Sequence, residues 1–438
     1  MAQILILLAF MGLLFLIKTT IKDIVSKKVI YCFLGYWMVS LLLSTLNLFN
    51  LYNVTITSYI YLLLNVISIV VGFCSLNIKP RSSCNTEMIN FEVVFSSKIF
   101  WMLFAVVLLF GIETLRTQFA VLLYYTTGNI KVDPMGLLFN GSKFKYYFFN
   151  LFCTPFYYIC MGLFAFLLLY ARSKKKTMLA LFLLVFVYSF IGGGRVSIMF
   201  IAFYVLMFYF WGDRIHLSNG NIKPIHITFK TIVFSIIAVC VLFFGMTIVT
   251  ALGQTGFSDS LDLESAYTSL MEQVVVYSVG PFRAFDYAIQ HPNIYFHDYY
   301  YGRASFCGFD YVVSLICGVF NCWFVPINYV TQSVLQETTI FVGKDIPFNY
   351  AYTNTMYSFY DMGVFGIIFF GFLFGRFYRY VIKLCYVKSS VFYFLLSCFT
   401  FYILMHTVFS NYFNKSFTVP LILTLLILGK LNFKKNSL

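Results

Sequence analysis

The chain has 438 residues, of which 61% are hydrophobic and only 11% are charged, and its mean hydropathy is +0.85. A soluble protein would carry about a quarter charged residues, so the composition excludes soluble domains and indicates a polytopic membrane protein. The net charge of +14 does not indicate nucleic-acid binding, because no basic, aromatic-interleaved soluble segment is present to carry it. In a membrane chain, basic residues mostly encode the topology.

Eleven apolar segments, separated by polar or basic breaks, predict an all-α fold of about eleven transmembrane helices. These segments fall at about 2–17, 29–48, 57–76, 99–115, 148–170, 178–193, 196–211, 231–251, 356–375, 390–410 and 417–433. The alternate loops and the C-terminal end on one side carry 21 of the 30 Lys and Arg residues, with Lys430 near the end of the last segment included. By the positive-inside rule this side is cytoplasmic, which predicts an N-out and C-in topology.

The apolar run over residues 178–211 contains three consecutive glycines and an arginine in its middle. As one helix it would be roughly 51 Å long, against a hydrocarbon core of about 30 Å. Basic segments flank both ends, so the number of crossings between them is even. Residues 192–195 are therefore expected to form the outward tip of a helical hairpin, with Arg195 opening the returning helix.

This topology divides the chain into three parts. Residues 1–251 hold the first eight helices, residues 252–355 form a large, partly helical extracytoplasmic loop, and residues 356–438 hold the last three helices. The long loop contains nine of the sixteen acidic residues and is rich in Tyr, Phe and Val. That composition argues against disorder, and folded loops of such length are usually functional. We therefore expect the chemistry to take place on the outer side.

Arginine suits a phosphate-bearing substrate, because its planar guanidinium binds two oxygens and stays charged. Four arginines are expected on the outer side: Arg116, Arg195, Arg283 and Arg303. Each also has a structural interpretation. Arginines at helix ends often snorkel to the headgroups, and those in aromatic surroundings often form cation–π contacts or ion pairs.

The segment that begins at Asn354 carries further candidates. Asp361 lies inside the start of a predicted span, where an ionisable group is costly and favours a functional interpretation. A helix cap or an ion pair is the structural alternative for this residue. Asp286 and His291, together with His297 and Asp298, are available as a general base, but their spacing singles out no pair.

Three blocks of the sequence resemble the O-antigen and capsule polymerases, the Wzy-type oligosaccharide repeat unit polymerases. The first is GGGRVSIMF at residues 192–200, and the second is GPFRAFD at residues 280–286 with the aromatic and glycine-containing stretch at residues 299–308. The third is NTMYSFYDMGVFG at residues 354–366. Some members carry an arginine followed eleven positions later by glycine in two outward loops, and this sequence lacks that pattern.

The resemblance implies a metal-independent glycosyltransferase of the bacterial inner membrane, without a cofactor. Its substrate would be an oligosaccharide linked to undecaprenyl pyrophosphate, and its partners would be membrane lipids and potentially a chain-length regulator protein. Arg195 and Arg283 are expected to hold the donor pyrophosphate, with Asp286 or His291 as the base. The residues expected to bind substrate are Arg116, Arg303, Asn354, Tyr357, Tyr360 and Asp361.

Two other functions stay open. An O-antigen ligase uses the same donor and shares the many spans and the large outward loop, so hydropathy does not separate it from a polymerase. A lipid-linked oligosaccharide flippase is a transporter, and transporters usually show repeat symmetry, which this sequence lacks. The block at residues 354–366 favours the polymerase over the ligase.

Overall fold

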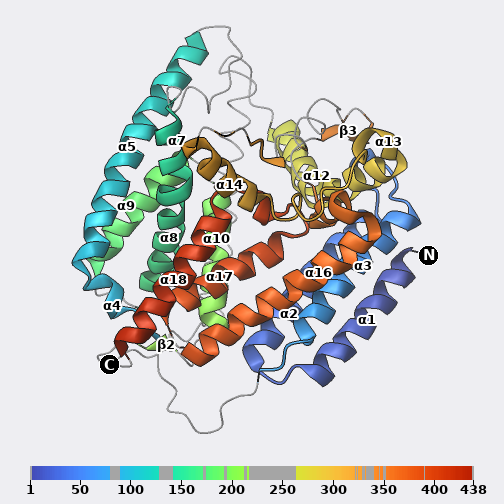
Figure 1. The fold of residues 1–438 in the computed structure, drawn as a ribbon. Helices are drawn as coiled ribbons and strands as arrows, with labels where there is room; N and C mark the ends of the chain where they lie inside the picture. The colour runs from blue at the N-terminus through green and yellow to red at the C-terminus, as the bar shows by residue number, and fades with distance from the viewer. Residues whose placement is uncertain are drawn as a thin grey trace.

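The computed structural model describes most of the chain. The described residues are 2–78, 89–127, 142–170, 174–191, 195–211, 215–216, 263–320, 322, 324–327, 331, 340–344, 346–348, 352–388 and 390–436. Within them the protein is mostly helical. The helices form two groups with a third group between them (Figure 1).

The first group lies on one side of the molecule, and its members pack side by side (Figure 1). It consists of α1 (Ala2–Thr20), α2 (Ile24–Ser44), α3 (Ile56–Cys74) and α16 (Asn354–Lys388). The second group lies on the opposite side and consists of α5 (Lys98–Thr127), α7 (Lys143–Phe148), α8 (Thr154–Tyr170) and α9 (Lys175–Ile191), with a π-turn at Phe149–Cys153 before α8. Between the two groups lie α10 (Arg195–Phe210), α17 (Val391–His406) and α18 (Thr418–Asn436). Helix α17 packs on α16 of the first group and on α10, and α10 in turn packs on α8 of the second group.

Ten of the eleven predicted spans coincide with helices of the structure. The eighth, at residues 231–251, lies outside the described residues, as do residues 192–194 of the predicted hairpin tip. Six helical segments in the described part are long and apolar enough to cross a membrane, and the apolar segments of α10, α17 and α18 are shorter. The structure therefore supports a membrane-embedded helical protein, whereas the number of crossings and their orientation stay predictions.

The prediction was wrong about the end of the ninth span. A cytoplasmic loop was expected at residues 376–389, but α16 continues as helix to Lys388. Buried side chains recur through this extension at helical spacing, at Tyr378, Val381, Ile382 and Cys385. Arg379 is also buried there, and its Nη1 lies 2.7 Å from Oδ2 of Asp23 in the α1–α2 connection.

Helices α3 and α16 approach each other closely because glycines line their contact. A Cβ atom added at Gly375 would lie 1.8 Å from the carbonyl oxygen of Ile69, and one at Gly72 would lie 2.0 Å from that of Phe372. These distances permit no side chain, so the two backbones are in direct contact. The glycines seen in the sequence of the ninth span thus have a packing role.

The described part of the segment predicted as a long loop contains several helices and two strands. It contains α12 (Leu263–Gln290), α13 (Pro292–Tyr295) and α14 (Cys307–Val319). Strands β3 (Ile340–Gly343) and β4 (Ile346–Phe348) form an antiparallel pair, and Leu51 of the α2–α3 connection forms a bridge with Gly343. A second, parallel pair joins β1 (Ile89–Asn90) to β2 (Ile215–His216), so the all-α prediction missed two small strand pairs. Short helices α4 (Glu92–Phe95), Leu48–Asn50 and Tyr412–Asn414 complete the described elements.

Candidate functional site

Three segments that are far apart in the sequence meet at one end of α16. We call this region the junction, and it comprises residues 299–307, 352–361 and 406–416. The backbone N–H of Asn354 donates to the carbonyl oxygen of Thr407 at 3.0 Å. The Asn411 side chain donates to the carbonyl oxygen of Ser305 at 2.8 Å. The junction therefore brings the third sequence block against the aromatic stretch of the second block.

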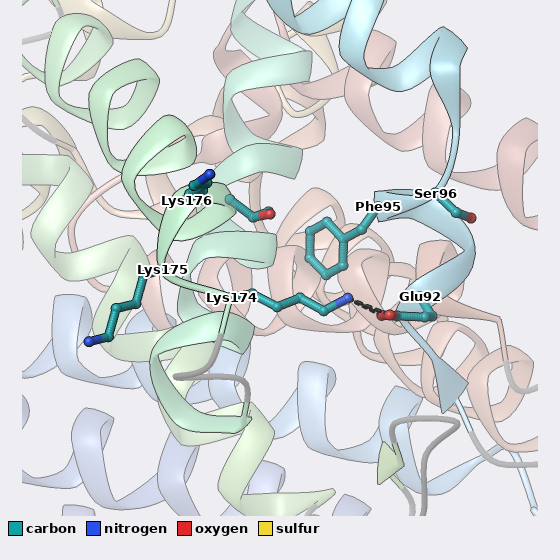
Figure 2. A pocket seen from close by; sticks show the side chains of 7 residues that line it. Glu92, Phe95, Ser96, Lys174, Lys175 and Lys176 are labelled. Carbon is teal, nitrogen blue, oxygen red and sulfur yellow. Dashed lines mark hydrogen bonds and ion pairs between the residues drawn. The ribbon is translucent and has the colours of Figure 1, made fainter.

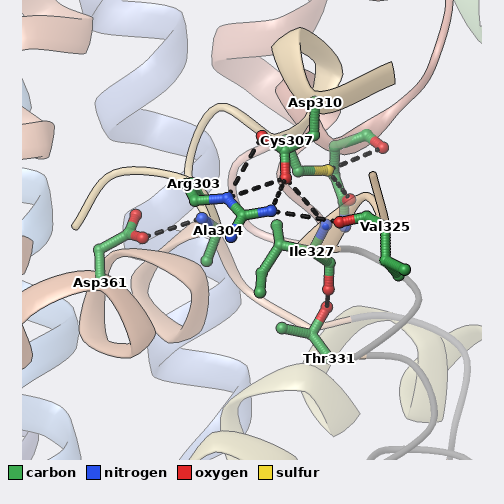
Figure 3. Close-up of polar contacts among 9 residues, drawn as sticks. Arg303, Ala304, Cys307, Asp310, Val325, Ile327, Thr331 and Asp361 are labelled. Carbon is green, nitrogen blue, oxygen red and sulfur yellow. Dashed lines mark hydrogen bonds and ion pairs between the residues drawn. The ribbon is translucent and has the colours of Figure 1, made fainter. Parts of the chain in front are cut away.

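Asp361 fixes the loop that precedes α14 (Figure 3). Its carboxylate is fully buried and accepts the backbone N–H of Ala304 at 2.8 Å and that of Ser305 at 2.7 Å. Its own carbonyl oxygen accepts the N–H of Tyr301 at 3.1 Å. Hydrogen bonds of this kind satisfy a buried carboxylate. Asp361 therefore positions this loop through backbone hydrogen bonds, rather than through the helix cap or ion pair considered above.

A break in α16 follows Asp361 directly. Gly363 has φ 60° and ψ −139°, a conformation that essentially only glycine adopts without strain. A Cβ atom there would also lie 3.2 Å from the Tyr299 hydroxyl. The opposing loop has positive φ as well, 50° at Tyr301 and 97° at Gly302. The loop at residues 299–302 and the break in α16 at Gly363 thus both contain residues with positive φ.

Buried polar side chains without partners concentrate at the start of α16. The Asn354 side chain is 1% exposed, and neither its Nδ2 nor its Oδ1 has a hydrogen-bond partner in the described part of the chain. Four hydroxyls share this property, those of Tyr352, Thr353, Thr355 and Tyr360. Buried polar groups are nearly always paired in native proteins, so five unpaired side chains within nine residues mark this segment as unusual.

Aromatic side chains surround these unpaired groups. The ring of Tyr360 lies 4.8 Å from that of Phe296 and 6.0 Å from that of Tyr300, centroid to centroid. The Tyr360 hydroxyl also lies within electrostatic reach of Tyr295 and Tyr352. Burial raises the pKa of Tyr352, so its hydroxyl stays protonated and able to donate at neutral pH.

Lys415 supplies a positive charge at the junction. The residue is exposed, yet the surrounding protein desolvates the ammonium group and lowers its pKa. No carboxylate of the described residues forms an ion pair with it. The preceding residue, Asn414, lies close to Tyr357 of the third block.

His406 lies in the last turn of α17, beside this cation. Its ring packs 4.9 Å from that of Tyr402 and 4.8 Å from that of Tyr412. Its Nδ1 atom is buried and has no partner among the described residues. Lys415 is close enough to act on the imidazole electrostatically. The junction therefore contains a buried histidine nitrogen without a partner in the described part of the chain.

The start of α10 approaches the same region. Phe200, in the second turn of α10, stacks on Tyr402 with a centroid distance of 3.4 Å and lies 5.8 Å from Tyr412. Arg195 is the first residue of this helix, roughly 7.5 Å along the axis from Phe200. The backbone thus begins α10 near the junction, although the Arg195 side chain lies outside the described part.

Arg303 lies at the edge of the junction and is paired (Figure 3). Its Nη2 donates to Oδ2 of Asp310 at 2.8 Å and to the carbonyl oxygen of Val325 at 3.2 Å. The guanidinium also lies 5.2 Å from the Phe324 ring centroid. The side chain is 44% exposed, so its outer edge remains open to a ligand.

Arg283 and Asp286 are placed on α12, and both are buried in hydrogen bonds to the first helices. Arg283 donates through Nε to the carbonyl oxygen of Tyr52 at 2.7 Å and through Nη2 to that of Ser44 at 2.9 Å. Desolvation lowers the pKa of Arg283 to about 10, so the guanidinium stays charged at neutral pH. Asp286 accepts the backbone N–H and the hydroxyl of Thr55 at the start of α3. This geometry favours a structural role for both residues.

His291 and Arg116 lie apart from the three segments of the junction. The His291 ring stacks on Tyr287 at 4.2 Å, and its Nδ1 lies 2.9 Å from the Tyr287 carbonyl oxygen. That contact orients the imidazole and leaves Nε2 for other uses. Arg116 forms an exposed pair with Glu113 at 3.8 Å on α5. Surface pairs of this kind contribute little to stability.

Sequence reasoning found Asn354, Tyr357, Tyr360 and Asp361, which the structure brings together, but it missed Lys415 and His406. His406 lies within the predicted apolar span at residues 390–410, and Lys415 lies in the short connection between this span and the last one, which carries no motif. Polar residues inside apolar runs are a signal that could have pointed to His406. Among the described residues, no group of three or more His, Cys, Asp or Glu is arranged to hold a metal ion.

Comparison with known proteins gives no relative: no protein-family model, no curated protein and no solved structure matches the chain.

Proposed function

We propose that the protein is a glycosyltransferase that polymerises lipid-linked oligosaccharide repeat units at the outer face of a bacterial inner membrane. The observation that carries the proposal is the cluster of unpaired buried polar groups at the junction, which also contains the cation Lys415. The resemblance of residues 354–366 to the polymerase family points to the same segment from the sequence.

The unpaired groups match a saccharide in chemistry. Each unpaired buried donor or acceptor costs about 1–3 kcal/mol, and a ligand that supplies partners recovers this cost. Sugars present many hydroxyls that donate and accept, and amide and hydroxyl side chains such as Asn354 and Thr355 do the same. The surrounding Tyr and Phe rings provide apolar surface for the C–H faces of the sugar ring.

The cations match a pyrophosphate. In the proposed step, a hydroxyl oxygen of the new repeat unit attacks the anomeric carbon of the growing glycan. The bond from this carbon to the phosphate oxygen breaks, and undecaprenyl pyrophosphate leaves with the bonding electron pair. Negative charge develops on the leaving group, where fixed cations stabilise the transition state. Lys415 is one such cation, and Arg195 at the start of α10 is the second.

The acceptor hydroxyl loses its proton in the same step. We assign His406 as the base, because its Nδ1 has no partner among the described residues and its ring lies at the junction beside Tyr412. His291, the base expected from the sequence, lies apart from the junction and is not assigned this role, although its Nδ1 contact with the Tyr287 carbonyl oxygen leaves Nε2 free of that contact. Asp361 is a positioning residue in this scheme, because both its oxygens hold the loop at residues 299–307.

The test replaces Lys415 in a host that depends on this gene for its surface glycan. Lys415→Gln removes the charge and should reduce polymerisation at least about a hundredfold, since a charge-stabilising contact contributes about 2.7–4 kcal/mol to such transition states. Lys415→Arg keeps the charge and should retain part of the activity. The readout is the ladder of chain lengths on a surface-glycan gel.

The control is Lys18→Gln, which removes an exposed lysine at the end of α1. It should leave the ladder unchanged. A wild-type ladder from Lys415→Gln, at a normal amount of inserted protein, would remove Lys415 from the proposed mechanism.

A further inference from the structure

A recess lies at the other end of α9, away from the junction, and Figure 2 shows the side chains that line it. Its volume is about 580 Å³. Its described lining comes from α4, the turn after it and the start of α9, and consists of Glu92, Phe95, Ser96, Lys174, Lys175, Lys176 and Thr177. Helix α9 has 17 residues and is therefore about 25 Å long, so this basic recess is well separated from the start of α10.

The charges in the basic recess do not cancel. Lys174 reaches across to the Glu92 carboxylate, and its ammonium lies 5.5 Å from the centroid of the Phe95 ring (Figure 2). Lys175 and Lys176 are exposed, and no described carboxylate pairs with them. Three lysines and one glutamate give the lining a net charge of +2, which suits a phosphate group.

Backbone and hydroxyl donors add to this charge. The N–H of Met178 donates to the carbonyl oxygen of Lys174 at 3.0 Å, so the N–H groups of the three residues between them precede the first helical hydrogen bond. The positive end of the helix dipole points to the same place. Ser96 and Thr177 contribute hydroxyls to the lining. The basic recess thus combines the donors that a phosphate monoester or diester needs.

Apolar helix faces continue from the basic recess along α5 and α9, which pack side by side. Their outer side chains are exposed, with Ile99 67% and Met102 62% exposed on α5 and Leu179 67% and Phe182 47% on α9. In a membrane-embedded helix pair these faces contact acyl chains. A free phosphate ester would use the charges alone, whereas a phospholipid would use the charges and the apolar faces together.

We propose that the basic recess binds the headgroup of an anionic glycerophospholipid, with its acyl chains lying along α5 and α9. Basic pockets beside transmembrane helices on the cytoplasmic side bind such headgroups in other membrane proteins. The site is independent of the junction and of the proposed transferase activity. It would anchor the α4 turn to the start of α9 at the level of the headgroups.

Native mass spectrometry of the full chain in detergent tests this proposal, with phosphatidylglycerol, phosphatidylcholine and glycerol 3-phosphate as probes. Phosphatidylglycerol should bind at least about tenfold more tightly than phosphatidylcholine. The double change Lys175→Gln/Lys176→Gln should weaken phosphatidylglycerol binding about tenfold or more, since each lysine near an anionic headgroup contributes on the order of 1 kcal/mol. The smaller change Lys176→Gln should weaken it by an intermediate factor.

The matched control is Lys18→Gln/Lys22→Gln, which removes one exposed lysine from the last turn of α1 and one from the α1–α2 connection. It should change the affinity by less than about twofold. An equal loss in both double variants, or no preference for the anionic lipid, would overturn the site. Binding of glycerol 3-phosphate as tightly as the lipid would overturn the assignment to a phospholipid.

Discussion

At the residue scale, the hydrogen-bond partners separate positioning residues from candidate ligand-binding residues. Sequence reasoning identified Asp361 as unusual but left its role open, and the structure shows both carboxylate oxygens paired with backbone N–H groups. It also expected Arg283 to bind phosphate, whereas the side chain is 3% exposed and donates to carbonyl oxygens 231 and 239 residues away. Partners so far apart in the chain leave no local pattern, so the sequence could not reveal them.

The unpaired Thr355 hydroxyl gives a residue-scale prediction. Thr355→Val keeps the shape and removes a buried hydroxyl that has no partner in the described part, so the free energy of unfolding should stay equal or rise by up to about 1 kcal/mol. Polymerisation should fall at the same time, because the proposed sugar contact is lost. Thermal unfolding in detergent and the chain-length ladder measure the two effects.

Thr407→Val is the control for this experiment. The Thr407 hydroxyl accepts from Trp37 Nε1 at 3.0 Å and donates to the Leu404 carbonyl oxygen at 2.7 Å. Its loss leaves the buried indole N–H unpaired and should destabilise the protein by about 1–3 kcal/mol. If Thr355→Val destabilised the protein as much as Thr407→Val, the Thr355 hydroxyl would have a structural partner. The proposal that the unpaired side chains bind a sugar would then lose its support.

At the element scale, hydropathy predicted ten helices that the structure contains, because long apolar runs bounded by basic residues determine helices strongly. It did not predict the continuation of α16 past residue 375. The basic residues there indicated a loop. In the structure, Arg379 is buried against Asp23 and the apolar positions keep a helical spacing. A charge count alone cannot distinguish an exposed basic loop from a helix whose arginine has a buried partner.

The close contact of α3 and α16 gives an element-scale prediction. Gly375→Ala places a Cβ 1.8 Å from the Ile69 carbonyl oxygen, so the two helices must separate. The variant should therefore lose about 1–3 kcal/mol of stability. Gly12→Ala on α1 meets nothing within 4 Å and should be neutral or stabilising by up to about 1 kcal/mol. Unfolding temperatures of the two variants in the same detergent check the difference. Equal temperatures would show that the helices do not touch at Gly375.

At the scale of the whole molecule, α12 connects the segment between α10 and α16 to the first helices. Arg283 and Asp286 on this helix bind the end of α2 and the start of α3, and strand β3 binds the connection between them. The sequence placed residues 252–355 in one loop and indicated that it was folded. It could not show that α12 packs against α2 and α3, since such contacts depend on residues more than 200 positions apart.

Arg283→Lys gives a prediction at this scale. A lysine carries the charge but lacks the fork that reaches Tyr52 and Ser44 together, so the variant should lose about 2–4 kcal/mol of stability. Arg376→Lys is the matched control, because Arg376 is exposed and makes only a long 3.4 Å contact with Ser75 in the described structure. A stable Arg283→Lys protein that has lost polymerisation would instead favour the phosphate-binding role expected from the sequence.

The central claim is that this chain extends a glycan on its lipid carrier at the junction. The most direct measurement uses the purified protein in liposomes with one undecaprenyl-pyrophosphate-linked repeat unit, and analyses the products by mass spectrometry. The account predicts lipid-linked products of two or more repeats from the wild type and almost none from Lys415→Gln. Repeat units that stay single in the presence of active wild-type protein, or that transfer only to a different acceptor, would contradict it.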